Sequence, residues 1–231
     1  MVKQHLKRIF TPKTWQIKRK SNVFVSRPKP GAHELKYGVS LNTFFKEMLK
    51  YCKTTKEVKQ ILNNKEVLVD GKRRKDERFL VGLMDVITIP STKESFRIVF
   101  SDKGHLSYVT IDNKESKFKL SKISGKTLIK GGKFQLNLSD ARNINIAKND
   151  YKVGDTLQIE VPSQKILKHF KLDVGSNIML TGGSHVGKNG ELKTIVGKTI
   201  TFVTSQGDEF ETKIEHAYVI GDKKSAIKTE E

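Results

Sequence analysis

The chain has 231 residues, of which 36% are hydrophobic, and 44 Lys and Arg against 25 Asp and Glu give it a formal net charge of +19. Because such an excess repels itself, the composition predicts a polyanionic partner, with nucleic acid as the leading candidate. An anionic membrane is disfavoured, since the chain has no long apolar run and no basic amphipathic segment with bulky apolar anchors. The modest apolar content favours several small modules over one large core.

The N-terminus reads MVKQHLKRIF and lacks the apolar stretch of a secretory signal or a membrane span. Cys52 is the single cysteine, which excludes a disulfide within the chain and indicates a reducing compartment. These features predict a cytoplasmic protein.

Residues 1–33 form a basic segment without any Asp or Glu. Pro12, Pro28 and Pro30 prevent a continuous helix, so we expect an extended arm. A disordered, solvated tail is the alternative, but the apolar residues of the segment favour an arm that is partly packed and ordered by a partner. Trp15 either stacks on a base or anchors the arm in the protein, and we favour the anchor.

Two helices are predicted after the arm. Apolar residues recur with a helical period in residues 40–49, with Ser40 as the N-cap. A second helix begins at the capping-box motif Thr54-x-x-Glu57. At 100° per residue, Lys56 and Lys59 lie opposite its apolar face, so this helix shows lysines outward while it packs inward.

A basic hairpin follows the second helix. Val67 and Val69 alternate with polar residues before Asp70-Gly71, a strong tight-turn signal. The basic run KRRK at residues 72–75 comes directly after the turn. A short strand at residues 85–89 is expected to close the unit.

The rest of the chain is predicted to be β-structure. Apolar residues alternate after residue 92 in several places, at 96–100, 134–138 and 157–161. After residue 174, strands are predicted at 199–204, 209–214 and 217–220. Evenly spaced short strands are typical of a small barrel. The polar tail from residue 222 is expected to fray.

The loop LTGGSHVGKNG, residues 180–190, matches the first seven places of the nucleotide-phosphate pattern G-x-x-x-x-G-K-[ST]. Asn189 stands where the pattern needs a hydroxyl group for magnesium. A nucleotide site also requires a helix after the loop, because the helix N-terminus attracts phosphate. The residues that follow, GELKTIVGKTITFV, show no helical period, so we reject a nucleotide site.

The same loop resembles the KOW motif, a strand-loop-strand on a small SH3-like barrel in ribosomal proteins and transcription elongation factors. The residues that carry the resemblance are Gly182-Gly183, His185, Gly187-Lys188 and Gly190, followed by a strand. The resemblance implies that Lys188 and His185 meet an RNA phosphate or ribose, while the glycines let the loop approach an RNA backbone. An ordinary glycine-rich hairpin is the alternative.

The helix pair, the segment VLVDGKRRKDERF and the strand VITI together resemble the S4 RNA-binding motif, in which two helices and a β-hairpin form one basic surface. A single basic hairpin would be a solvated face, but the helix pair before it favours the S4 motif. The matching positions are Lys56, Lys59, Lys72, Arg73 and Arg74, which suit contact with phosphates.

The order of modules resembles the ribosomal protein S4e family, a small-subunit family of archaea and eukaryotes, over residues 3–221. The segments that match are HLKRIFTPKTW, RKSNVF, RPKPGAH, QLNLSDARN and AYVIGD. The length and the short polar tail look more archaeal than eukaryotic. Ser139-Asp140-Ala141 replaces the family's usual His-Asp-Gly, so no role of that histidine or glycine is carried over.

With this resemblance the predicted fold class is α+β in several modules. These are an extended basic N-terminal arm (1–39), an S4-like α/β RNA-binding unit (40–91), a central β domain (92–173), a C-terminal SH3-like β-barrel with the KOW motif (174–221) and a polar tail (222–231).

The expected function is that of a non-catalytic structural protein of the small ribosomal subunit. Its expected partners are small-subunit rRNA, bound mainly through backbone phosphates, and neighbouring ribosomal proteins, with no small-molecule substrate or cofactor. The residues expected to contact RNA are Lys3, Lys7, Arg8, Lys13, Trp15, Lys18, Arg19, Lys20, Arg27, Lys29, Lys56, Lys59, Lys72, Arg73, Arg74, Lys75, His185 and Lys188.

Neither a catalytic nor a metal constellation is apparent. The histidines lie at no ligand-like spacing, and one cysteine cannot build a zinc pattern. Asp140 beside Arg142 would be the acid of an S4-bearing RNA-modifying enzyme, one alternative function, but a lone loop aspartate is more often a turn residue or the partner of its neighbouring arginine. A KOW-containing transcription or translation factor is the other alternative.

Overall fold

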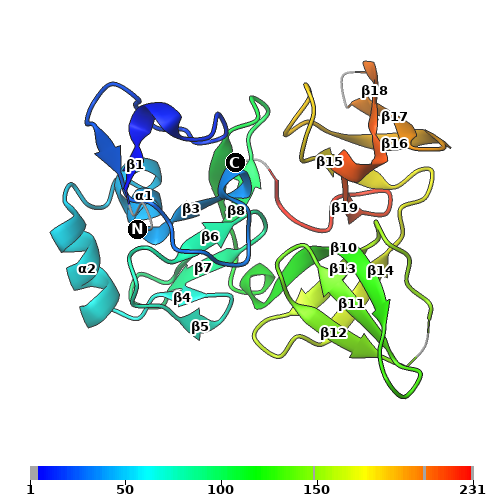
Figure 1. Cartoon of the computed structure of the whole chain (residues 1–231), viewed down its shortest axis with the longest axis horizontal. Coiled ribbons are helices and arrows are strands. Elements are labelled where there is room, and N and C mark those ends of the chain that lie inside the picture. Colours follow the sequence, from blue (N-terminus) through cyan, green and yellow to red (C-terminus); the bar gives the residue numbers. More distant parts are fainter. Residues whose placement is uncertain (1–4, 148, 205–206, 230–231) are drawn as a thin grey trace. The chain divides into compact units, whose positions relative to one another are not determined.

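The computed structural model describes residues 5–147, 149–204 and 207–229 of the chain (Figure 1). The chain divides into two compact units. The first consists of Met1–Val99 and His105–Ser116, and the second of Phe100–Gly104 and Lys117–Glu231.

The first unit is built on a five-stranded sheet in the order β5-β4-β7-β8-β9. The strands are β4 (Leu68–Val69), β5 (Lys72–Arg73), β7 (Val86–Ile89), β8 (Glu94–Phe100) and β9 (Leu106–Thr110). This order corrects the predicted boundary at residue 92. The turn after β7, in which Lys93 has φ +58°, returns β8 antiparallel to β7, so β8 and β9 extend the sheet of the first unit instead of opening a central domain.

The predicted first helix is a helical segment of two kinds, α1 (Leu41–Thr43) and the wider π-helical turn η3 (Phe44–Met48). Ser40 caps it as predicted, because its Oγ accepts a hydrogen bond from the Thr43 N–H at 3.1 Å. The ring of Phe44 lies edge-on to the rings of Phe96 in β8 and Tyr108 in β9, with centroids 6.1 and 6.0 Å away. This aromatic cluster seats the segment on the sheet.

The second helix, α2 (Thr55–Asn64), begins where the capping box predicts. Thr54 Oγ1 accepts a hydrogen bond from the Glu57 N–H at 3.3 Å, and Glu57 Oε2 accepts one from the Lys53 N–H at 2.9 Å. Val58 and Leu62 are fully buried, so the helix packs inward through its apolar face.

The N-terminal arm folds back on the first unit, which corrects the expectation of an extended arm. Strand β1 (Leu6–Lys7) pairs with β2 (Phe24–Val25), and β3 (Gly38–Ser40) pairs with β6 (Leu80–Gly82). Two single-turn helices, η1 (Arg8–Phe10) and η2 (Leu35–Tyr37), complete the arm. Trp15 holds it in place, because its side chain is 2% exposed and its indole N–H donates to the Leu35 carbonyl at 3.0 Å.

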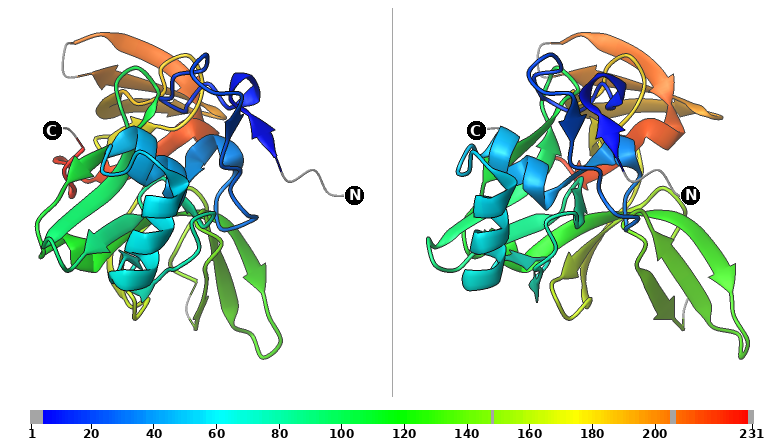
Figure 2. Two further views of the ribbon diagram at one scale, coloured as in Figure 1. Left: turned by 90° about the vertical axis from the view of Figure 1, so that its left-hand side faces the viewer. Right: turned by 60° about the vertical axis from the view of Figure 1, so that its left-hand side comes forward.

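The second unit contains two five-stranded sheets. The first has the order β12-β11-β10-β13-β14, with strands β10 (Phe118–Leu128), β11 (Phe134–Leu138), β12 (Asn143–Ile146), β13 (Thr156–Glu160) and β14 (Ile166–Phe170), and a single-turn helix η4 (Glu115–Lys117) before β10. Figure 2 shows the end of the β10–β11 hairpin projecting from this sheet. Its core is formed by alternating residues of three strands: Ile123, Leu136, Leu138, Leu157 and Ile159.

The other sheet is antiparallel throughout, in the order β18-β17-β16-β15-β19. Its strands are β15 (Asn177–Leu180), β16 (Asn189–Val196), β17 (Thr199–Thr204), β18 (Glu209–Lys213) and β19 (Ala217–Gly221), with the single turn η5 (Ile214–His216) before β19. The strands that the sequence predicts after residue 199 are therefore confirmed.

Hydrogen bonds join the two sheets of the second unit, and the one from Tyr218 is buried. The Tyr218 hydroxyl in β19 donates to the Leu120 carbonyl in β10 at 2.8 Å. The Lys122 ammonium of β10 donates to the carbonyls of Glu215 and Ala217 at 2.7 and 2.6 Å. Both sheets therefore share one joint, and β10 is its centre.

The tail that was expected to fray is packed as far as the structure describes it, to residue 229. The Ala226 N–H donates to the Ile220 carbonyl at 2.8 Å, and Asn189 Nδ2 donates to Thr229 Oγ1 at 3.2 Å. Ile227 is buried. One apolar side chain and these hydrogen bonds thus order a segment whose composition is polar.

Candidate nucleic-acid interface

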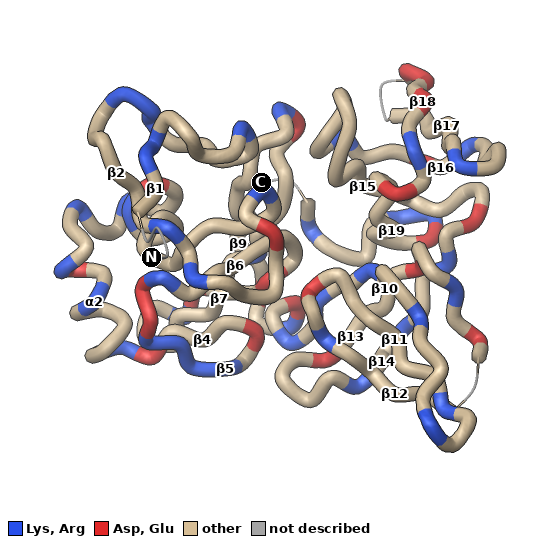
Figure 3. Tube along the Cα trace, in the orientation of Figure 1, with Lys and Arg blue, Asp and Glu red and all other residues tan. Residues whose placement is uncertain are grey.

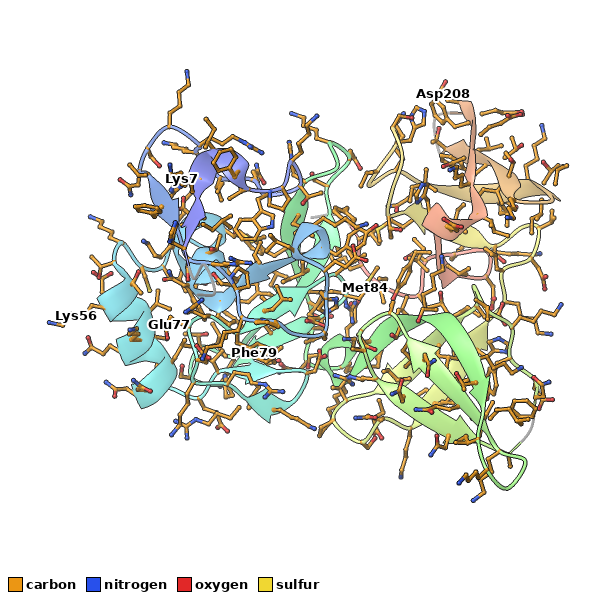
Figure 4. The ribbon with its side chains drawn as sticks, in the orientation of Figure 1. Lys7, Lys56, Glu77, Phe79, Met84 and Asp208 are labelled. Carbon is orange, nitrogen blue, oxygen red and sulfur yellow. The ribbon has the colours of Figure 1, made fainter. Side chains whose placement is uncertain are left out.

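Helix α2 presents lysines on the face opposite its buried side. Lys56 and Lys59 are exposed, and Figure 4 shows Lys56 pointing away from the unit. Lys59 Nζ lies 3.4 Å from Glu77 Oε1, a partly exposed ion pair that contributes little to stability. The predicted outward face of α2 is confirmed.

The β4–β5 hairpin carries the basic run next to this helix face. Asp70 and Gly71 have φ +49° and +70°, as the predicted tight turn requires. Asp70 Oδ1 accepts a hydrogen bond from the Val86 N–H at 3.0 Å, which fixes the turn to β7. Beyond it, Lys72 is exposed, and Figure 3 shows Lys and Arg along β5 and on α2.

A direct contact joins the hairpin to the helix. The Arg73 guanidinium donates to the carbonyl of Asn63, in the last turn of α2, at 3.2 Å. The Arg74 guanidinium lies 4.4 Å from the centroid of the Phe79 ring, a cation–π contact that holds it half-buried. Lys75 is exposed. The basic side chains of α2 and the hairpin therefore stand on one rigid support.

The arm adds exposed cations to the same unit. Lys7, Lys13, Lys18, Lys20 and Arg27 are exposed, whereas Lys3 lies outside the described residues. Two further cations of the predicted set, Arg19 and Lys29, are exposed but also serve the fold. The Arg19 guanidinium donates to the carbonyls of Ile9 and Pro12, each at 3.2 Å, and Lys29 forms an ion pair with Asp76.

Two residues of the predicted RNA-contact set are in the protein interior, which corrects their assignment. Arg8 is 4% exposed, pairs with Glu47 and donates to the Lys18 carbonyl at 3.0 Å. Trp15 is the anchor described above. Both side chains tie the arm to the unit, so neither is placed to contact RNA.

Sequence reasoning missed Lys50, which lines a cleft of about 840 Å³ beside the arm. Lys13, Lys18 and Arg19 line the same cleft, together with apolar side chains that include Met48. Lys50 is exposed and has φ +59° at the end of the helical segment. Its signal in the sequence is weak, because it is a single cation directly after the apolar helical period.

In the loop 180–190 the glycines are explained by protein packing. A Cβ atom on Gly187, which has φ +89°, would lie 1.9 Å from the Ser101 carbonyl oxygen. One on Gly190 would lie 2.4 Å from the Val203 carbonyl oxygen, and one on Gly182 would lie 2.4 Å from the His216 ring. Close packing within the second unit is therefore sufficient to explain these three glycines. At Gly183 the positive φ of +86° is the constraint.

The two basic residues of this loop share one aromatic support. The His185 ring centroid lies 4.1 Å from that of Phe210 in β18, and Lys188 Nζ lies 4.2 Å from the Phe210 centroid. Strand β16 follows the loop directly. A strand therefore stands where a nucleotide site would require a helix, as the sequence predicts.

Asp140 belongs to a buried ion cluster. Its Oδ2 lies 2.9 Å from Lys119 Nζ and 3.2 Å from Arg142 Nε, so the predicted pairing with Arg142 is confirmed and Lys119 is an additional partner. Ala141 has φ +57°, the backbone region that glycine adopts without strain. The bend therefore holds an alanine in a conformation that is free of strain only for glycine.

Burial changes the acid–base properties of the joint between the two sheets. It lowers the pKa of Lys122 from 10.5 to about 8, although the nearby Glu215 carboxylate opposes the shift. Burial likewise raises the pKa of the Tyr218 hydroxyl well above its usual value of 10.0. These shifts concern the fold of the second unit and not a reaction.

Within residues 5–147, 149–204 and 207–229, the His, Cys, Asp and Glu side chains form no group of three that could hold a metal ion. No helix in these ranges has the length and apolar character needed to cross a membrane.

Three family models match: the RS4NT domain at residues 2–36, the S4 domain at residues 47–87 and the ribosomal family S4e at residues 92–166. These matches define a ribosomal-type protein with an S4 domain.

Relatives that match nearly the whole chain identify the family within this class. The small ribosomal subunit protein eS4 of Methanocaldococcus jannaschii is 39% identical, covering 98% of this chain and 97% of that protein. The protein of the same name from Methanocella arvoryzae is 40% identical, covering 98% of each. The crystal structure of the 30S ribosomal protein S4e from Thermoplasma acidophilum superposes with a TM-score of 0.70 at 33% identity, over 80% of this chain and 96% of that one. The chain belongs to the ribosomal protein S4e family.

Proposed function

We propose that the chain is a structural constituent of the small ribosomal subunit and binds small-subunit rRNA mainly through backbone phosphates. The observation that carries this proposal is the rigid support of α2 and the β4–β5 hairpin, which presents Lys56, Lys59, Lys72, Arg73 and Lys75 together. Family membership places the chain among ribosomal proteins and not among S4-bearing RNA-modifying enzymes or elongation factors.

The arrangement suits structured RNA. Double-stranded RNA is recognised largely by its shape and its backbone, because its deep major groove excludes side chains. Lysines and arginines held on a rigid surface displace counterions from the phosphates and gain affinity from their release. A fixed support also lowers the entropy that the protein loses when it binds.

We also propose that the loop 180–190 is a KOW motif and that its sheet is an SH3-like barrel. This loop would make a second contact with the same RNA. Phe210 supports this assignment, because it holds both His185 and Lys188 at the surface of the unit. The exposed cations of the arm form a third contact. Neighbouring ribosomal proteins complete the proposed set of partners.

One pair of triple variants tests the main surface. Lys56→Ala, Lys72→Ala and Lys75→Ala together remove three exposed charges from α2 and the hairpin, and Lys165→Ala, Lys168→Ala and Lys171→Ala remove three exposed charges from the second unit. We expect the first variant to bind archaeal small-subunit rRNA more weakly and to lower the salt slope by about 3, one unit for each lost phosphate contact.

Filter binding over a range of salt concentrations measures both quantities, and thermal unfolding checks that each variant is folded. Equal losses of affinity for the two triple variants would show that net charge, and not this surface, governs binding. Unchanged binding of the first variant would overturn the placement of the main contact.

A further inference from the structure

The folded arm exposes four large apolar side chains on neighbouring segments. Ile9 and Phe10 are 66% and 73% exposed, and Val23 and Phe24 are 64% and 54% exposed. Single exposed apolar residues are ordinary, but two exposed pairs on neighbouring segments of a small module indicate that a partner covers this part of the arm.

Hydrogen bonding brings the two pairs to the same part of the arm. Phe24 in β2 stands opposite Lys7 in β1, and the next amide along, the Arg8 N–H, donates to the Val23 carbonyl at 3.0 Å. Ile9 and Phe10 follow immediately in the single turn η1. The aromatic rings of Phe10 and Phe24 thus belong to two segments that run side by side.

Contacts within the protein fix the backbone that carries these side chains. Arg19 donates to the Ile9 carbonyl beside Phe10, and the buried Arg8 is paired with Glu47 of the helical segment. The His5 ring lies edge-on to Phe24 at 5.5 Å between centroids. The backbone that carries both phenylalanines is therefore fixed before any partner arrives, which lowers the entropic cost of binding.

The surroundings of the four side chains indicate the chemistry of the partner. Residues 5–33 contain no Asp or Glu, and exposed Lys7, Lys18 and Lys20 belong to the same segment. Aromatic rings beside cations match unpaired nucleotides, which present a flat base and a charged phosphate together. Paired RNA offers its phosphates but keeps its base faces stacked inside the helix.

We propose that Phe10 and Phe24 form a stacking platform for unpaired bases of RNA, and that the neighbouring lysines hold the phosphates of the same nucleotides. This inference rests on the proposed rRNA binding and names the element of RNA structure that the arm binds. It gives the arm a role different from that of α2 and the hairpin, which are proposed to contact backbone phosphates of structured RNA.

The test uses the full chain and two probes, a 12-nucleotide oligo(A) strand and a 16-base-pair RNA duplex. Phe10→Leu with Phe24→Leu keeps the apolar character but removes both rings, whereas Phe10→Tyr with Phe24→Tyr keeps the rings. We expect the Leu variant to bind the single strand about tenfold more weakly for each ring lost, with the same salt slope and unchanged affinity for the duplex. The Tyr variant is expected to bind both probes as the unchanged chain does.

Leu167→Ala with Val196→Ala removes exposed apolar residues of the second unit and serves as the matched control. Fluorescence of the buried Trp15 reports whether the arm is folded in each variant. If the unchanged chain binds the single strand and the Leu variant binds it equally well, the stacking platform is overturned while the proposed function stands. If the unchanged chain binds neither probe nor small-subunit rRNA, the proposed function itself fails.

A third result also overturns the platform. If the Leu variant binds the single strand normally and only Phe10→Ala with Phe24→Ala weakens it, apolar area and not ring stacking is responsible for the affinity.

Discussion

Lys119 and Asp140 are oppositely charged side chains that the fold removes almost completely from water, with 1% and 3% of their surface exposed. Transfer of each charge into the interior costs several kcal/mol, and their mutual attraction offsets this cost only while both are present. Arg142 makes a second contact to the same carboxylate. Asp140 therefore contacts both cations of the cluster.

Replacement of Asp140 by Asn tests this pairing at constant size. We expect the free energy of unfolding to fall by about 3–5 kcal/mol, because the buried Lys119 loses the charge of Asp140 beside it. Urea denaturation measures the change. The matched control is Glu209→Gln, which breaks the exposed Lys193–Glu209 pair and should cost about 1 kcal/mol or less. Similar losses for the two variants would contradict the role given to burial.

Among the elements, the loop before β16 has a tight packing requirement at Gly187. Gly187→Ala would combine a positive φ with a Cβ atom placed against the Ser101 carbonyl oxygen, which is backbone and cannot move alone. Gly197→Ala introduces the same group at φ +58° with open space around it.

We expect the Gly187 variant to unfold at a clearly lower temperature than the Gly197 variant. The Gly197 variant should lose only about 1 kcal/mol, the cost of a non-glycine residue in the left-handed region. Thermal unfolding followed by circular dichroism compares the two. Equal losses of thermal stability would mean that the positive φ alone, and not the approach to Ser101, explains the glycine at position 187.

Strand β10 introduces a pH dependence through Lys122. Its pKa is about 8 in the folded chain and 10.5 in the unfolded chain, so between these pH values the unfolded chain holds the proton and the folded chain does not. Stability therefore rises with pH in this window and gains up to about 3 kcal/mol. The cost of the buried charge is fully present below pH 8.

Two effects limit this rise. The carbonyls of Glu215 and Ala217 accept hydrogen bonds from Lys122 and favour its charged form. Above pH 10, Tyr218 ionises more easily in the unfolded chain, because its pKa is raised in the folded one, and stability falls. Urea denaturation at pH 7.5, 9 and 10 should show increasing stability, and Lys122→Met should reduce the increase. A Met variant with an unchanged pH profile would assign the effect to another group.

At the scale of the whole molecule, the charge of +19 determines how binding responds to salt. Neutralisation of about 8 phosphates predicts that affinity for small-subunit rRNA falls by about four orders of magnitude between 50 and 200 mM salt. Filter binding at several salt concentrations gives the slope, and sedimentation with small ribosomal subunits after a high-salt wash tests assembly. A nearly flat isotherm would contradict binding through phosphates.

Local sequence signals predicted those parts of the fold that neighbouring residues determine. The cap at Thr54 and the turn at Asp70-Gly71 need only side chains and backbone preferences within a few positions. The strands after residue 199 were found for the same reason, because their alternation is local.

Features that depend on distant partners were not predictable in this way. Arg8 is buried where it pairs with Glu47, which lies 39 positions later in the chain. Trp15 is buried where it contacts Leu35 and pairs with Leu106. Composition alone shows only that such residues are basic or aromatic. Assignment of β8 to the first sheet likewise depends on its pairing with β7, which alternation does not reveal.

The hydrogen bond between Tyr218 and the Leu120 carbonyl spans 98 positions of the chain, and this has a consequence for synthesis. Residues up to 116 supply the whole of the first unit, so we expect it to form while later residues are still being translated. The second unit must wait for β19, because β15 lacks a neighbour on one side and Leu120 lacks its donor until that strand leaves the exit tunnel. A nascent chain released before Ala217 would therefore carry a finished first unit and an open sheet edge.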